Sequence, residues 1–124
     1  MRRFFIILTF LTLVGCAASP IAPPKDKELA RTSNLARAAF EEGAAAKAID
    51  LYSKALNRAI AMDDATEIGN ATYNLSLCHI LLGQLNQASS SLAEAKAAFE
   101  RSQSNPVDVL LLEATIAQRQ GKLE

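Results

Sequence analysis

Side chains able to carry out chemistry are few in this chain of 124 residues. The one histidine, His79, is more simply explained as a packing residue than as a catalytic base, because the sequence offers no Ser-His-Asp candidate. The acidic pairs Glu41-Glu42 and Asp63-Asp64 are sequence neighbours, and neighbours on a helix do not face each other. The sequence has no Gly-rich phosphate loop and no His/Cys cluster with the spacing of metal ligands. We therefore expect no enzymatic activity, no cofactor and no metal.

Cys16 is the residue whose surroundings predict a covalent modification. Arg2 and Arg3 precede an apolar run over residues 4–14, and Cys16 follows it closely. The run is shorter than the roughly 20 residues that cross a bilayer as a helix, and it fits the apolar region of a secretory signal. The residues at its end are Leu13, Val14, Gly15 and Cys16.

This segment resembles the lipobox of bacterial lipoproteins, in which Leu, a variable residue and a small residue precede the cysteine. The resemblance implies that residues 1–15 are a signal peptide, that the Cys16 thiol receives a diacylglyceryl group, and that the new amino terminus is acylated. Two or more acyl chains anchor a protein stably to a membrane. An ordinary signal peptide with a chance cysteine is the alternative.

In that family, Asp in the position after the cysteine tends to retain a lipoprotein in the inner membrane. In this chain the residue after Cys16 is Ala17. The resemblance therefore implies the cell envelope, on the periplasmic face of the outer membrane in a Gram-negative source or outside the plasma membrane in a Gram-positive one. Residues 16–25 also hold Pro20, Pro23 and Pro24, which favour an extended spacer. We expect this segment to tether a folded domain to the lipid.

The composition narrows the class of partner. The 13 basic and 13 acidic residues form no basic block, so nucleic acid and anionic lipid surfaces are poor candidates. Cys78 is the only other cysteine, so with Cys16 bound to lipid no internal disulfide is expected. Cys78 lies on an apolar stripe and is expected to be a small buried side chain. Because alanine dominates and β-branched residues are sparse, the fold class predicted is all-α.

Apolar residues at helical spacing lie on both sides of Gly83, which is suited to close a helix end. They are Ala71, Leu75, Cys78 and Leu82 before it, and Leu85, Ala88, Leu92, Ala95 and Phe99 after it. Gly43 and Gly121 stand at nearly equal distances along the chain on either side of Gly83. The residues that follow Gly43 match those that follow Gly83, with Ala48, Tyr52 and Ala55 corresponding to Ala88, Leu92 and Ala95. This is internal repetition of the kind that builds helical solenoids.

The repeated residues resemble the tetratricopeptide repeat, a family of antiparallel helical hairpins. The matches are Leu35, Ala36, Gly43, Ala48, Tyr52, Ala55 and Leu56 in one copy, and Tyr73, Asn74, Leu75, Gly83, Ala88 and Ala95 in the next. Three features depart from the family: Leu92 fills an aromatic position, no proline closes the first copy, and the period from Gly43 to Gly83 exceeds the usual value of about 34. The departure in period suggests longer second helices.

The folded domain is expected over residues 26–124, with repeats at about 29–62 and 69–103 and a partial one at 106–124. Asp26, Asp64 and Asn105 are the expected helix caps, with Pro106 at a first helical position. Over residues 44–62 the inward side chains expected are Ala48, Leu51, Tyr52, Ala55, Ala59 and Met62. The fifth helix is expected to run through Val107, Leu110, Leu111, Ala114 and Ala117. With about two and a half repeats, either the chain is truncated, the fifth helix is a cap, or a second copy or another partner covers its open face.

In the family, the first helices of each pair line a concave groove that binds a protein or peptide. Carried over to this chain, the groove residues are Asn34, Arg37, Glu41, Asn70, Tyr73, Asn74, Leu77, Ile80 and Leu81, with Ser33 and Phe40 beside them and Asp108, Leu111, Leu112, Thr115 and Arg119 further along. The asparagine amides can bond a peptide backbone. The alternative for the apolar members is that they cover neighbouring helices. The family's clamp for a terminal carboxylate is not matched, since only Asn74 fits it.

Together these features predict a lipid-anchored scaffold or adaptor that holds a protein partner at the envelope. The alternative is an accessory or regulatory subunit of an envelope enzyme or of a secretion, pilus or outer-membrane assembly complex.

Overall fold

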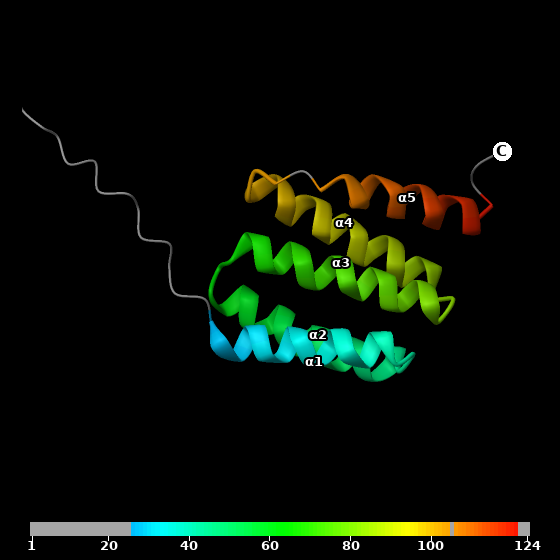
Figure 1. Ribbon diagram of the computed structural model, residues 1–124. Helices are drawn as coiled ribbons and strands as arrows, with labels where there is room; N and C mark the ends of the chain where they lie inside the picture. Colours follow the sequence, from blue (N-terminus) through cyan, green and yellow to red (C-terminus); the bar gives the residue numbers. More distant parts are fainter. Residues whose placement is uncertain (1–25, 105, 122–124) are drawn as a thin grey trace, which may run out of the picture.

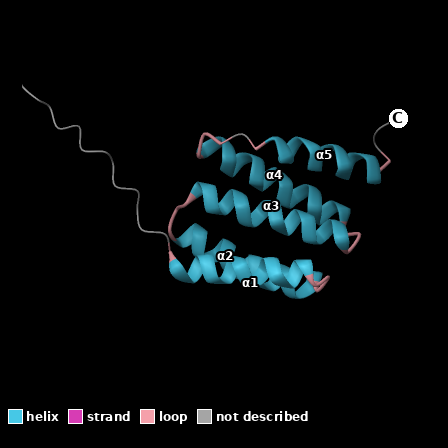
Figure 2. Cartoon of the chain, in the orientation of Figure 1, coloured by secondary structure: helices cyan, strands magenta, loops and turns pink. Residues whose placement is uncertain are grey.

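The computed structural model describes residues 26–104 and 106–121, which form five α-helices. These are α1 (Lys27–Glu41), α2 (Ala45–Ala61), α3 (Ala65–Leu81), α4 (Leu85–Arg101) and α5 (Val107–Arg119). Each helix packs mainly against the next one in sequence, in a row of antiparallel rods (Figure 1). The described part contains helices and turns without strands (Figure 2), so the all-α class and the helical hairpins are confirmed. The predicted signal peptide, Cys16, the predicted tether and Asn105 lie outside the described residues.

The four turns between these helices share one geometry. Each has a residue with positive φ, at position 43, 63, 83 or 103, so the left-handed positions recur at equal intervals along the chain. At the first, the Gly43 and Ala44 N–H groups donate to the carbonyls of Phe40 and Ala39. This pair of bonds is the Schellman arrangement, which closes a helix end. Gly43 and Gly83 are the predicted hinges, while the two turns between hairpins use Asp63 and Gln103, which sequence reasoning did not single out.

Two of the predicted caps are confirmed. The Asp26 carboxylate accepts from the Leu29 N–H at 2.7 Å, and Asp64 accepts from the Glu67 N–H at 3.0 Å. At α5 the expectation was wrong, because Pro106 is itself the N-cap and the first helical residue is Val107. Its extended backbone, with ψ at 123°, ends the turn and offers no side-chain hydrogen bond.

The core is lined by small side chains. The alanines predicted to face inward from α2 are buried, and so are those of α4. Tyr52 is 4% exposed, whereas Met62 is 42% exposed, so its inward assignment was wrong. The reason is that Met62 follows the last residue of α2 and is part of the turn. The fully or nearly buried alanines are Ala36, Ala39, Ala48, Ala55, Ala59, Ala88, Ala95 and Ala98.

A close approach joins α3 and α4. A Cβ placed on Gly69 would lie 2.5 Å from Cε1 of Phe99, so the aromatic ring rests directly on the glycine backbone. Further along α3, the Ser76 hydroxyl donates to the Ala88 carbonyl across the interface at 2.7 Å. These contacts join the two halves of the segment that carries the second repeat.

α5 packs only one of its apolar stripes against the core. Val109, Leu112 and Ile116 are buried, whereas Val107 and Leu110 are 71% and 59% exposed. The helix carries two apolar stripes at helical spacing, and periodicity alone cannot tell which of them packs. Gly121, predicted at the position of a third hinge, follows the end of α5 and has a positive φ of 68°, like Gly43 and Gly83.

Gly69→Ala is expected to destabilise the fold by about 1–2 kcal/mol, because crowding against Phe99 outweighs the gain in helix propensity. The measurement is urea denaturation followed by circular dichroism. In a Phe99→Leu background the same glycine substitution should be neutral or stabilising, because the ring is gone. An equal loss in both backgrounds would contradict the contact.

Gln103→Gly is expected to raise the free energy of unfolding by about 0.5–1 kcal/mol, since an L-residue with φ of 56° is strained where glycine is not. Gly43→Ala is the reverse experiment, because it adds a side chain at a position with positive φ. A Cβ there would meet no atom within 4 Å, so the expected loss of about 1 kcal/mol is purely conformational. Thermal unfolding of both variants measures this. A stabilised Gly43→Ala would show that the left-handed turns do not limit stability.

Candidate functional site

An open groove of about 620 Å³ lies between α1 and α3. Leu29, Ala71 and the side chain of Tyr52 from α2 form its apolar part. Four of the predicted groove residues line it, together with Ser33 from the wider set. Those four are Asn34, Arg37, Asn70 and Asn74. The structure thus brings together the polar half of the predicted site.

The amides of this groove are only partly satisfied by the protein. Asn74 Nδ2 donates to the Asn70 carbonyl at 2.8 Å, which fixes the amide plane and leaves Asn74 Oδ1 as an acceptor. Arg37 Nη2 contacts Asn34 Oδ1 at 3.4 Å, a long bond between exposed groups. The groove therefore carries donors and acceptors of the type that pair with peptide N–H and C=O groups.

The hydroxyl-bearing ring of Tyr52 belongs to both core and groove. Burial raises the pKa of this phenol, the nearby Glu41 carboxylate adds to the rise, and the Arg37 guanidinium opposes it. Tyr52 therefore remains neutral at physiological pH and can act as donor or acceptor. Sequence reasoning placed Tyr52 in the core alone, although its repeat position beside Ala48 and Ala55 was the signal for a side chain reaching towards the first helices.

Carboxylates gather where α1 and α3 begin, at Asp26, Asp64 and Glu67. Asp26 and Asp64 are the helix caps, so each of these carboxylates already accepts a hydrogen bond from a backbone N–H of its own helix. Arg58 Nη2 also contacts Asp26 Oδ2 at 2.8 Å. The hydrogen bond from Arg58 and the one from the Leu29 N–H lower the pKa of Asp26. Sequence reasoning identified the caps but not their place at the mouth of the groove.

The apolar half of the predicted site lies elsewhere. Tyr73 and Leu77 are partly buried against the core formed by α3, α4 and α5, and Ile80 is a member of that core at 7% exposure. Ile80 is absent from the residues that line the groove between α1 and α3, so its placement in the groove was wrong. It packs because α4 and α5 cover that side of α3. Leu81 is exposed at the end of α3, and Glu41 is exposed at the end of α1.

The wider set of groove residues has similar outcomes. Phe40 is partly buried against the core of the first hairpin, and Leu112 is 7% exposed in the core of α5. Asp108, Leu111 and Arg119 lie on α5, and none of them lines the groove between α1 and α3.

His79 and Cys78 form no reactive arrangement. His79 Nδ1 lies 2.7 Å from Gln84 Oε1 across the turn between α3 and α4. Burial raises the pKa of the Cys78 thiol to about 11, so it remains protonated and packed. Among the residues that the structure describes, no three His, Cys, Asp or Glu side chains could share a metal ion. The side chains that line the groove between α1 and α3 are thus suited to hydrogen bonding.

No family model, curated protein or solved structure matches this chain. Over the described part of the chain, every helix is too short or too polar to cross a bilayer.

In a Cys16→Ser background, Cys78 is the single thiol. We expect it to react with a thiol reagent at least about a hundredfold more slowly in the native protein than in denaturant, because only opening of the core exposes it. A colorimetric disulfide reagent measures both rates. An exposed cysteine introduced as Ala38→Cys is the positive control. Equal rates for Cys78 in the two states would contradict its burial.

Proposed function

We propose that this chain is a lipid-anchored adaptor of the bacterial cell envelope that binds an extended segment of a partner protein in the groove between α1 and α3. The observation that carries the proposal is the groove itself, with its exposed amides above an apolar floor. Side chains of these kinds form hydrogen bonds and apolar contacts, which is the chemistry of binding a peptide.

The groove suits a peptide in extended conformation. α1 has 15 residues, which at 1.5 Å per residue makes it about 22 Å long. An extended peptide rises about 3.3 Å per residue, so roughly six or seven residues fit along it. Asn34, Asn70 and Asn74 bond its backbone, Arg37 attracts an acidic side chain, and Leu29 and Tyr52 contact an apolar one.

The helical hairpins support membership of the tetratricopeptide repeat class, as do the repeated residues around Gly43 and Gly83. In each of the two hairpins the turn between the helices is closed by a glycine with positive φ, and the two glycines lie at the same place in the repeat. In this proposal α1 and α3 are the first helices of two successive repeats, which is the side that binds partners in that class.

The anchor rests on the lipobox-like residues that end at Cys16. Lipid on Cys16 holds the chain at the membrane, and residues 16–25 separate the lipid from α1, which begins at Lys27. The groove then faces partners of the envelope, on the periplasmic side of the outer membrane in a Gram-negative source.

The test is recovery of crosslinked partners from membranes by the full chain. A double Asn70→Ala, Asn74→Ala variant is expected to recover at least about fivefold less partner, because two hydrogen bonds of about 1 kcal/mol each are lost. The matched control is Asn57→Ala with Asn86→Ala, two asparagines of α2 and α4 that lie outside the groove. Tyr73 and Leu77 are poor choices, because their removal also weakens the core.

Equal losses in the two double variants, or unchanged recovery in the groove variant, would exclude the groove. The anchor is scored separately in the same preparation: Cys16→Ser should shift the chain from the membrane to the soluble fraction. The alternative, a regulatory subunit of an envelope enzyme, predicts that the parent chain has no activity alone but alters the rate of that enzyme on mixing.

A further inference from the structure

The groove between α1 and α3 carries opposite charges at its two ends. Glu67 lines it near the start of α3, and Arg37 lines it near the end of α1. Because Gly43 and Gly83 occupy the same place in the two hairpins, Glu67 lies level with Lys27 of α1. From that level to Arg37 the groove extends for about 15 Å, at a rise of about 1.5 Å per helical residue.

The basic end of the groove is formed by Arg37. Within residues 26–104 and 106–121, this side chain takes part in no ion pair. Its Nη2 contacts Asn34 Oδ1, one turn earlier in α1 and also on the groove. Glu41, one turn later, does not line the groove. The guanidinium therefore presents an unpaired positive charge to a bound segment.

At the acidic end, Glu67 is the carboxylate that the fold leaves available. Asp26 is bonded to Arg58, and Asp64 caps α3. A glutamate three residues after a cap can accept from the backbone N–H of the capping residue, but the Asp64 N–H donates to the Ala59 carbonyl. Over the described part of the chain, the Glu67 carboxylate also has no ion pair, so it can accept bonds from a cationic group.

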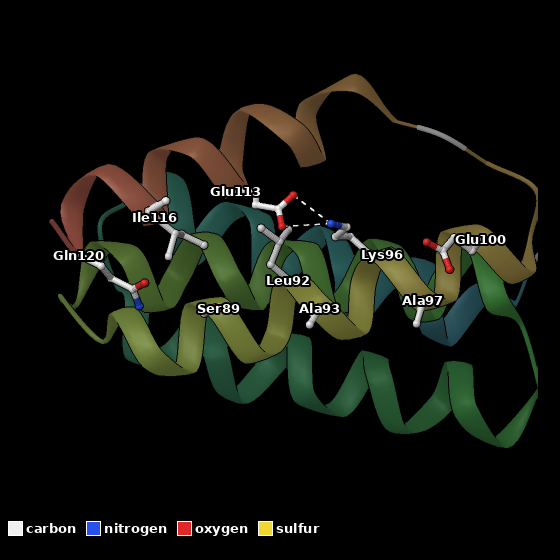
Figure 3. A pocket seen from close by; sticks show the side chains of 10 residues that line it. Ser89, Leu92, Ala93, Lys96, Ala97, Glu100, Glu113, Ile116 and Gln120 are labelled. Atoms are coloured by element: carbon white, nitrogen blue, oxygen red, sulfur yellow. Dashed lines mark hydrogen bonds and ion pairs between the residues drawn. The ribbon is translucent and has the colours of Figure 1, made fainter. Parts of the chain in front are cut away.

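The groove between α4 and α5 is different, because its opposite charges are already paired. It measures about 420 Å³, and Lys96 and Glu113 point toward each other across it (Figure 3). Lys96 Nζ lies 2.9 Å from Glu113 Oε2. A ligand there would have to displace this pair before it could use either charge. The groove between α1 and α3 offers its two charges directly.

We infer that the segment bound between α1 and α3 carries a basic and an acidic side chain four residues apart, with an apolar side chain midway between them. The inference rests on the function proposed above, binding of an extended segment in this groove. In an extended chain, residues i, i+2 and i+4 point to the same side. Four residues at about 3.3 Å each span about 13 Å, which flexible charged side chains extend to the separation of Glu67 and Arg37.

The middle side chain of such a segment meets the apolar floor of the groove. Tyr52 from α2 and Ala71 from α3 form this floor between the two charged ends. The amides of Asn70 and Asn74 lie along the same stretch and bond the peptide backbone. The charges thus select side-chain types and their spacing, and either backbone direction brings the basic residue to Glu67 and the acidic one to Arg37.

The test uses three synthetic peptides of seven residues with blocked ends and a central leucine. They differ only in the residues two before and two after it, which are Lys with Glu, Lys with Lys, or Glu with Glu. Binding to the full chain in detergent is measured by NMR titration at low ionic strength, from the backbone signals of α1 and α3. The parent chain is expected to bind the Lys–Glu peptide at least about threefold more tightly than the other two.

Charge reversal in the groove should switch this preference. Glu67→Lys is expected to bind the Glu–Glu peptide best, and Arg37→Glu the Lys–Lys peptide, each by at least about threefold. Arg31→Glu and Glu94→Lys are the matched controls, because they reverse exposed charges of α1 and α4 outside the groove and should keep the parent preference. Circular dichroism monitors folding. If a reversal loses helicity, Glu67→Gln or Arg37→Gln replaces it and should abolish the preference at its end.

Equal affinities of the three peptides for the parent chain would overturn the inference, and so would the same change of preference in the control variants. The Asn70→Ala, Asn74→Ala variant separates this result from the proposed function, because it should weaken all three peptides alike. If it does so while Glu67→Lys and Arg37→Glu keep the parent preference, the groove binds peptides and the charge pattern is wrong. If no peptide shifts the signals of α1 and α3, both the pattern and the groove are wrong.

Discussion

Close approach of neighbouring helices is the constraint on which the rest of this structure depends. Alanines fill the contact positions of α2 and α4, and at one tight point the ring of Phe99 rests on the backbone of Gly69. Small side chains let two backbones come near, but each contact then buries little apolar area. Stability is consequently shared along the row, each helix depending on the next, as in solenoid proteins.

The sequence predicted most of the fold because two of its signals have direct physical causes. Apolar spacing of three and four residues defined the helices, and Gly43 and Gly83 defined turns that need positive φ. The turns at Asp63 and Gln103 were missed, because these residues adopt the same backbone at a cost and composition does not reveal it. Only their positions, midway between successive glycine turns, could have indicated them.

The site was predicted in part, and the division follows the chemistry of the side chains. Asn34, Arg37, Asn70 and Asn74 were correctly placed together, since polar residues on the first helices have no core to enter. Apolar residues were harder to assign, because a side chain such as Ile80 can pack against a partner or against neighbouring helices. In the structure Ile80 packs in the core. α5 shows the same ambiguity, because it carries two apolar stripes and only one of them is buried.

Asp26 stands at the junction between the described domain and the residues that precede it. Its carboxylate holds the Leu29 N–H of α1 with one oxygen and the Arg58 guanidinium of α2 with the other. The two bonds therefore form a mechanical link between α1 and α2 at the residue where the described domain begins. Since those bonds also lower the pKa of Asp26, the mechanical link would persist until strongly acidic conditions protonate it.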